Sequence, residues 1–152
     1  MQFEHVVQVN DLVDRLTPNL TRSELWEGLV LRATKPEYFL IGLGEYQLEW
    51  QEDQSLKRSL ELPGVVVDDR VTFQEANFVH YNIVPTATVA SGSLTMTIEE
   101  PEPESLFVRF SYCARYLENI GDDHPYDLFA QQAYIAADID TIHIIRQRMA
   151  GR

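Results

Sequence analysis

Cysteine is almost absent from this sequence, and so are long apolar runs. The 152 residues contain one cysteine, Cys113, so an internal disulfide is excluded, which is typical of a reducing compartment. No apolar stretch approaches the roughly 20 residues of a membrane span, and the start MQFEHVV lacks the basic and then apolar pattern of an export signal. We therefore expect a cytoplasmic protein without membrane insertion.

Positive charge is scarce as well. Lys and Arg together number 12, against 24 for Asp and Glu, which gives a net charge of -12 at pH 7. A protein this acidic repels phosphate backbones and anionic lipids. Nucleic acid is therefore excluded as an expected partner.

The motifs of several common enzyme classes are also missing. The chain has no Cys pair, no two neighbouring histidines and no Gly-x-Ser-x-Gly, and Gly42 and Gly44 lack the third glycine of a dinucleotide loop. Asp140 and His143 have the spacing of one metal-binding helix, but no second copy exists, so a solvated helix face is the better interpretation. We expect neither a metal nor another cofactor.

The order of secondary-structure signals is the most informative feature that is present. Phe3–Val9 alternates between apolar and polar residues, as a half-buried strand does. Thr21-Arg22-Ser23-Glu24 is a capping box, so Asn19-Leu20-Thr21 is interpreted as a helix start rather than a glycosylation site. A helix of about three turns follows, Pro36 ends it, and Glu37–Leu40 forms a short second helical piece.

The middle of the chain predicts six further strands, and its hydrophobic content of 45% is enough for one core, so we expect a single domain over residues 1–152. Alternation and turn residues place these strands at Tyr46–Gln51, Leu56–Leu62, Asp69–Gln74, Phe78–Val84, Ser93–Glu99 and Leu106–Tyr116. Short loops join them, so neighbouring strands pair antiparallel.

A long amphipathic helix is predicted from Pro125 to about Met149, with His124 as its cap. Acidic residues gather near its start and arginines near its end, which complements the helix dipole. Its apolar stripe consists of Leu128, Ile135, Ile139, Ile142, Ile145 and Met149.

These proportions favour a hollow interior. Seven strands span roughly 34 Å, whereas one helix is only about 10 to 12 Å across. A twisted sheet of this width curls around the helix and leaves an apolar cavity, the usual form of a small-molecule site. The alternative is that large side chains fill the space, since seven Phe, seven Tyr and two Trp are available.

A family resemblance supports the same α+β architecture. The order of elements and the segments MQFEHVVQVN, LTRSELWEGLVLRA and LFVRFSY resemble the AtaL-like family of the START-like (SRPBCC, birch-pollen-allergen-like) helix-grip superfamily, which includes polyketide cyclases. The resemblance covers essentially the whole chain. It implies a curved seven-stranded antiparallel sheet wrapped around a long C-terminal helix and a hydrophobic cavity, but no shared reaction. The turn Glu52-Asp53-Gln54 lacks the glycines of the allergens' loop at this place, so no role of that loop is carried over.

Polar residues in the aliphatic phase of each strand are the site candidates, because a buried polar group needs a partner or a purpose. Arg58 can bind a carboxylate or enolate oxygen, or it can lie at the sheet rim beside water or an acidic neighbour. In one strand both phases carry large groups, so either His80 or Tyr81 faces the cavity. The full set of candidate cavity residues is His5, Tyr46, Trp50, Arg58, His80, Tyr81, Met96, Phe110, Tyr112, Ile135, Ile139 and Ile142.

Three functions are compatible with these observations. The first is binding of a hydrophobic small molecule, either lipid-like or an aromatic, polyketide-like metabolite. The second is a cyclase or dehydratase in which Arg58 or Tyr112 stabilises an enolate and His5 or His80 moves the proton. The third is a non-catalytic protein-interaction module, although the outer phase of the last strand is mixed rather than broadly apolar. The sequence neither indicates nor excludes a homodimer, and Cys113 should face away from the cavity.

Overall fold

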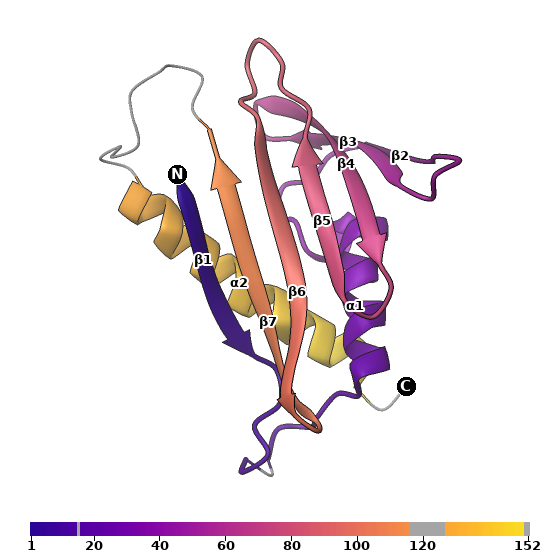
Figure 1. Cartoon of the computed structure of the whole chain (residues 1–152). Coiled ribbons are helices and arrows are strands. Elements are labelled where there is room, and N and C mark those ends of the chain that lie inside the picture. The colour runs from indigo at the N-terminus through magenta and orange to yellow at the C-terminus, as the bar shows by residue number, and fades with distance from the viewer. Residues whose placement is uncertain (15, 116–126, 151–152) are drawn as a thin grey trace.

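A computed structural model describes residues 1–14, 16–115 and 127–150 of the chain, and its main feature is one seven-stranded sheet that partly encloses a long helix (Figure 1). The elements in chain order are β1 (Gln2–Gln8), α1 (Arg22–Thr34), the 3-10 turn η1 (Pro36–Tyr38), β2 (Tyr46–Trp50), β3 (Leu56–Leu62), β4 (Val65–Gln74), β5 (Phe78–Ile83), β6 (Gly92–Glu102), β7 (Ser105–Ala114) and α2 (Asp127–Met149). The predicted helix-grip architecture is confirmed.

The strands pair antiparallel throughout, in the spatial order β1-β7-β6-β5-β4-β3-β2. β1 therefore lies beside the last strand, β7, and β1 and β2 form the two opposite edges of the sheet. The segment that contains α1 and η1 connects these two edges. β4 starts at Val65, earlier than the predicted Asp69. The reason is the tight turn at Pro63-Gly64, where Gly64 has a φ of 77° and leads β3 directly into β4.

The start of α1 follows the predicted capping box. The backbone N–H of Glu24 donates to the Thr21 hydroxyl over 3.0 Å, and the backbone N–H of Thr21 donates to the Glu24 carboxylate over 2.8 Å. Lys35 ends the helix, and the predicted second helical piece is the single 3-10 turn η1. Phe39 and Leu40 follow directly after this turn.

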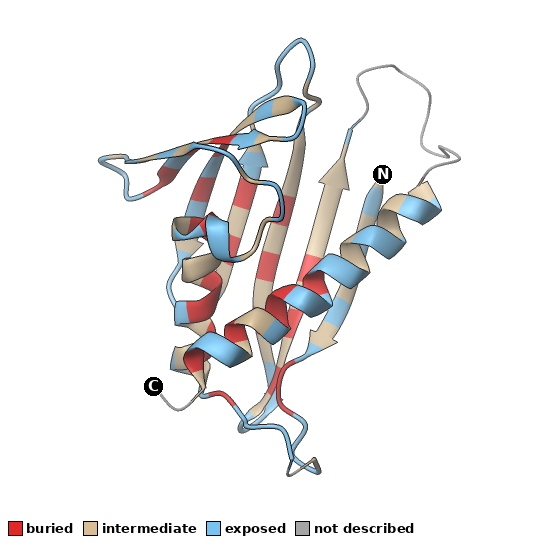
Figure 2. Ribbon diagram, turned by 180° about the vertical axis from the view of Figure 1, so that it is seen from behind, coloured by how far each residue is buried: buried red, intermediate tan, exposed pale blue. Residues whose placement is uncertain are grey.

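α2 crosses the concave face of the sheet, and its buried residues lie toward its C-terminal half (Figure 2). The predicted apolar stripe is only partly right, because Ile142, Ile145 and Met149 are buried whereas Leu128 and Ile139 are 62% and 54% exposed. Asp138 and Thr141 occupy the buried face instead. The predicted cap His124 and first residue Pro125 lie outside the described residues.

Close packing between α1 and α2 fixes where the helices meet. A Cβ atom at Gly28 would lie 2.2 Å from Cγ2 of Ile145, so only glycine fits at this crossing. The C-terminal half of α2 therefore rests on α1 and on the main core, while its N-terminal half runs away from α1 toward β1 (Figure 1). No helix in the described part of the chain combines the length and apolar character needed to cross a membrane.

Candidate functional site

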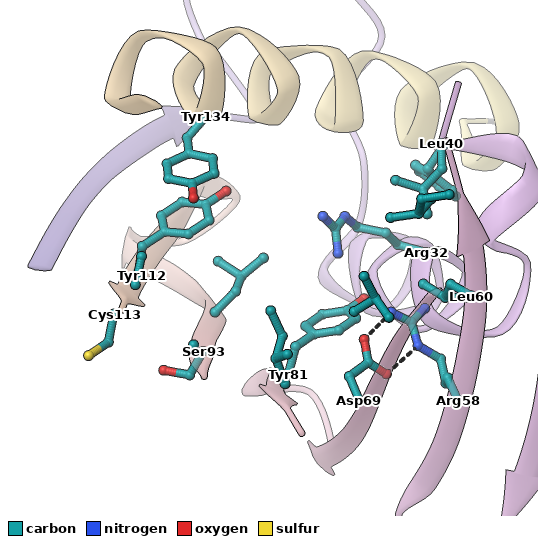
Figure 3. Close-up of a pocket in the computed structure, with 17 residues that line it drawn as sticks. Arg32, Leu40, Arg58, Leu60, Asp69, Tyr81, Ser93, Tyr112, Cys113 and Tyr134 are labelled. Carbon is teal, nitrogen blue, oxygen red and sulfur yellow. Dashed lines mark hydrogen bonds and ion pairs between the residues drawn. The ribbon is translucent and has the colours of Figure 1, made fainter. Parts of the chain in front are cut away.

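A cavity of about 240 Å³ lies between the concave face of the sheet, the end of α1 and the N-terminal half of α2 (Figure 3). Its wall is mostly apolar and includes Phe39, Leu40, Leu60, Val67, Ile83 and Leu94. Apolar walls with a few polar groups are characteristic of small-molecule sites. Of α2, only Tyr134 contributes to the described wall.

Three of the predicted candidates line this cavity, namely Arg58, Tyr81 and Tyr112. The open question in β5 is settled in favour of Tyr81, which is 5% exposed. His80 lies on the opposite face of the sheet, where its Nδ1 is 2.7 Å from the Thr95 hydroxyl. Binding of a ligand by the three lining residues stays a prediction.

Three other candidates are core residues that do not line the cavity. Met96 and Phe110 are fully buried beneath α2, and Ile142 is 2% exposed in the same cluster. All three side chains lie in the interior, between the sheet and α2. The helix covers that part of the sheet, so the space above these residues is filled.

A further group of candidates lies away from the cavity near solvent. Trp50 is 57% exposed and packs on Phe73, with ring centroids 5.6 Å apart, and the Tyr46 hydroxyl donates to Glu37 over 2.8 Å. These residues belong to β2, the edge strand that extends beyond the helices. Ile139 is exposed, and Ile135 is half-buried without lining the cavity.

Arg58 is buried and paired, which corrects the expectation of a place at the rim. Its Nε and Nη2 donate to the two carboxylate oxygens of Asp69 over 2.8 and 2.6 Å, and its Nη1 donates to the Ala33 carbonyl over 3.1 Å. The two residues face each other in the β3–β4 register. The expected acidic neighbour therefore exists, and the pair is close to neutral as a unit.

A second charged group at the cavity, Arg32 on the last turn of α1, was not predicted. Its side chain extends into the cavity in Figure 3, and its Nε has no hydrogen-bond partner. The guanidinium carbon lies 5.0 Å from the centre of the Tyr81 ring, and that of Arg58 lies 5.0 Å from the same centre. Tyr81 thus lies next to both cations, and its own hydroxyl is buried without a hydrogen-bond partner.

At the other end of the cavity, Asp138 of α2 joins β1 and β7. The Tyr112 hydroxyl lies 2.8 and 2.7 Å from the two carboxylate oxygens, and Nε2 of His5 lies 2.7 Å from Oδ2. Tyr134 stacks on Tyr112 with ring centroids 4.1 Å apart. His5 therefore reaches the cavity only through Asp138 and Tyr112.

Burial sets the protonation behaviour of this cluster. It raises the pKa of the Asp138 carboxyl, although the hydrogen bonds from His5 and Tyr112 and the charge of Arg32 act in the opposite direction. Burial, and then the neighbouring Asp138 charge, raises the pKa of Tyr112 far above its ordinary value. The same two causes raise the pKa of Tyr134. Both phenols are therefore protonated donors at neutral pH.

The sequence does contain signals for the residues that were missed. Arg32 follows Leu25 by seven residues and Leu29 by three, which places a cation on the buried face of α1. Asp69 has the same phase as Val71 and Phe73 and pairs with Arg58 across one hairpin. Cys113 borders the cavity, but its sulfur points away from Tyr112 in Figure 3.

Within residues 1–14, 16–115 and 127–150, no cluster of three or more His, Cys, Asp or Glu side chains is arranged to hold a metal ion. The polar groups of the cavity are two arginines, one aspartate, a serine and three tyrosines.

Comparison with known proteins places this fold in a family. Residues 7–151 match the profile of AtaL, described as acetylaranotin biosynthesis cluster protein L. The chain belongs to the AtaL family. The sequence matches none of the curated proteins with which it was compared.

Several solved structures share the fold of this AtaL family member at low sequence identity. The Zhui aromatase/cyclase from Streptomyces sp. R1128 has 16% identity and a TM-score of 0.60, with 97% of this chain and 94% of that chain covered. The di-domain ARO/CYC StfQ of the steffimycin biosynthetic pathway has 10% identity and a TM-score of 0.68 over 98% of this chain, which spans 50% of StfQ. Ara h 8.0201 has 12% identity, a TM-score of 0.62 and coverage of 100% and 99%. These likenesses establish a common helix-grip fold.

Proposed function

We propose that this protein binds a small hydrophobic molecule, either lipid-like or aromatic and polyketide-like, in the cavity between the sheet and α2. The observation that carries the proposal is the mostly apolar cavity of about 240 Å³, which the side chains of α2 leave open. The aromatase/cyclase descriptions of two similar structures agree with an aromatic or polyketide-like ligand. The size lies below the roughly 300 to 1,000 Å³ of drug-sized sites, so the ligand has one or two rings or a short chain.

A ligand panel tests this proposal. Purified protein is incubated with naphthalene derivatives, alkylphenols and short fatty acids, and binding is measured by thermal shift and native mass spectrometry. We expect at least one ligand to bind with a stoichiometry of one and to raise Tm as its concentration rises. Sugars of similar size serve as the control and should give no shift. If no member of so diverse an apolar panel binds, the proposal is wrong.

A second candidate is an enzyme that closes a ring and releases water, and the His5–Asp138–Tyr112 cluster favours it. Tyr112 lines the cavity, and its hydroxyl donates its single proton to Asp138, so it would stabilise an enolate oxygen by turning that proton from the carboxylate to the ligand. Asp138 and His5 lie behind it as a path for the proton. Arg58 is committed to Asp69, and His80 is on the other face, so neither fits the role considered for it.

This enzyme hypothesis has its own test. A linear triketone is incubated with the protein, and a cyclic product lighter by one water is sought by mass spectrometry. Tyr112→Phe and His5→Gln should abolish conversion while the triketone still binds. Binding without conversion by the unaltered protein would leave the binding function and reject the enzyme.

A further inference from the structure

Arg32 is the one charged group among the described cavity-lining residues that has no ionic partner. The other two charged residues of the wall, Arg58 and Asp69, neutralise each other through two hydrogen bonds. Asp138, the acidic side chain of α2 nearest in the fold, forms its hydrogen bonds with His5 and Tyr112 and no ion pair with Arg32. The cavity therefore has an apolar wall and a single uncompensated positive charge.

A buried guanidinium N–H without an acceptor is costly, because its desolvation is not offset by a hydrogen bond. Arg32 Nε has no partner, and neither does the buried hydroxyl of the adjacent Tyr81. An oxygen atom between these two groups would accept from both. Such unsatisfied donors in a cavity indicate the chemistry of the molecule that occupies it.

Building on the proposed function, we propose that Arg32 anchors an anionic oxygen of the ligand, with the Tyr81 hydroxyl as a second donor. The ligand is then a small amphipathic acid: an apolar body against Leu60, Ile83 and Leu94, and a carboxylate or enolate group at the Arg32 end. Arginine suits this role because its planar fork presents two parallel N–H groups to a carboxylate and keeps its charge at every physiological pH.

Three probes of equal size test the inference on the intact protein. They are naphthalene carboxylate, the neutral naphthalene carboxamide and the cationic naphthylmethylamine, each titrated by isothermal calorimetry at constant pH and salt. We expect the carboxylate to bind at least about tenfold more tightly than the amide, and the amine to bind most weakly. Because this comparison uses the unaltered chain, it does not depend on whether a variant folds.

Substitution of Arg32 then assigns the preference to this residue. Arg32→Gln should lower the carboxylate affinity to that of the amide and leave the amide affinity unchanged, and Arg32→Lys should retain part of the preference. The matched control is Arg22→Gln on the first turn of α1, where Arg22 pairs with Glu100 away from the cavity. This control should leave the affinities of all three probes unchanged.

The outcomes separate the inference from the function on which it rests. Equal affinities of the three probes for the unaltered protein, or a carboxylate preference that survives Arg32→Gln, would overturn the role of Arg32 while leaving a hydrophobic cavity site in place. Failure of all three probes to bind, together with a negative apolar panel, would overturn both.

Discussion

At the scale of single residues, the interior contains charges whose partners decide their roles. Arg58 and Asp69 are 5% and 4% exposed and satisfy each other, whereas Arg32 faces the cavity without an acceptor. A satisfied pair holds the wall in shape, and an unsatisfied cation is available to a ligand. Arginine thus has a structural role at Arg58 in β3, whereas we propose that Arg32 in α1 binds the ligand.

The Arg58–Asp69 pair provides a test of that structural role. Arg58→Met leaves a buried carboxylate without its partner, so we expect a loss of about 3 to 5 kcal/mol in the free energy of unfolding, measured by urea denaturation. The double variant Arg58→Met/Asp69→Leu removes both charges and should recover most of the loss. Arg22→Met at an exposed ion pair is the control and should cost about 1 kcal/mol or less. A cost that small at Arg58 would contradict the structural role.

Asp138 gives a pH-dependent prediction. Its pKa is raised in the folded state, so the folded protein binds a proton more tightly than the unfolded chain, in which an aspartate has a pKa of about 3.9. The stabilising contribution is therefore complete below that value and is lost as pH rises through the folded pKa. Relative to Asp138→Asn, the protein should lose stability as pH rises above about 4.

Urea denaturation between pH 4 and pH 7 measures this difference. Both proteins are compared in a His5→Gln background, so that the imidazole next to Asp138 does not contribute. A gain in stability relative to Asp138→Asn over this range would mean that hydrogen bonds, rather than burial, dominate the pKa of Asp138.

Residue-level contacts were harder to predict than the strands that carry them. His5 and Asp138 are 133 positions apart in the sequence, and their contact depends on how α2 lies on β1, which no local pattern specifies. Arg58 and Asp69 depend on the hairpin register, which the turn at Gly64 determines. The aliphatic phase alone identified Arg58, Tyr81 and Tyr112 as candidates but left their partners open.

At the scale of elements, local signals were sufficient where the physical cause is local. The capping box at Thr21 and the alternation in the seven strands depend on neighbouring residues only, and both predictions are confirmed. Apolar spacing predicts the inner face of α2 only in part, because it leaves out the buried polar residues of that face. Asp138 is buried by its hydrogen bonds with His5 and Tyr112, and this rotates Ile139 to the solvent side.

The crossing of α1 and α2 yields an element-scale prediction. Gly28→Ala places a methyl group 2.2 Å from Cγ2 of Ile145, so the helices must separate. We expect a loss of about 1 to 3 kcal/mol by urea denaturation, even though alanine favours a helix over glycine. Adding Ile145→Ala should make the double variant more stable than the sum of the two single effects predicts. Glu27→Ala, on an exposed position of the same turn, controls for the alanine itself and should have little effect.

At the scale of the whole molecule, the proportions of sheet and helix explain why a space remains. The two helices cover the sheet where Val79, Met96 and Phe110 are fully buried, and the cavity begins where α1 ends and the strands continue toward Ile83, Leu94 and Tyr112. The sequence predicted an excess of sheet width over helix width. It did not predict the position of the cavity, because that depends on the diagonal path of α2 (Figure 2).

Two substitutions on one strand test this division of the interior. Val79 and Ile83 lie four residues apart on the same face of β5, one in the dense core and the other at the cavity. Val79→Phe has no room and should cost about 1 to 3 kcal/mol in the free energy of unfolding. Ile83→Phe extends into open space, so it should change stability by less than about 1 kcal/mol and weaken the binding of naphthalene carboxylate at least about tenfold. Urea denaturation and calorimetry measure both quantities on both variants. An Ile83→Phe variant as unstable as Val79→Phe would mean that the space is too small for a guest, whereas a stable one that still binds would place the ligand elsewhere on the molecule.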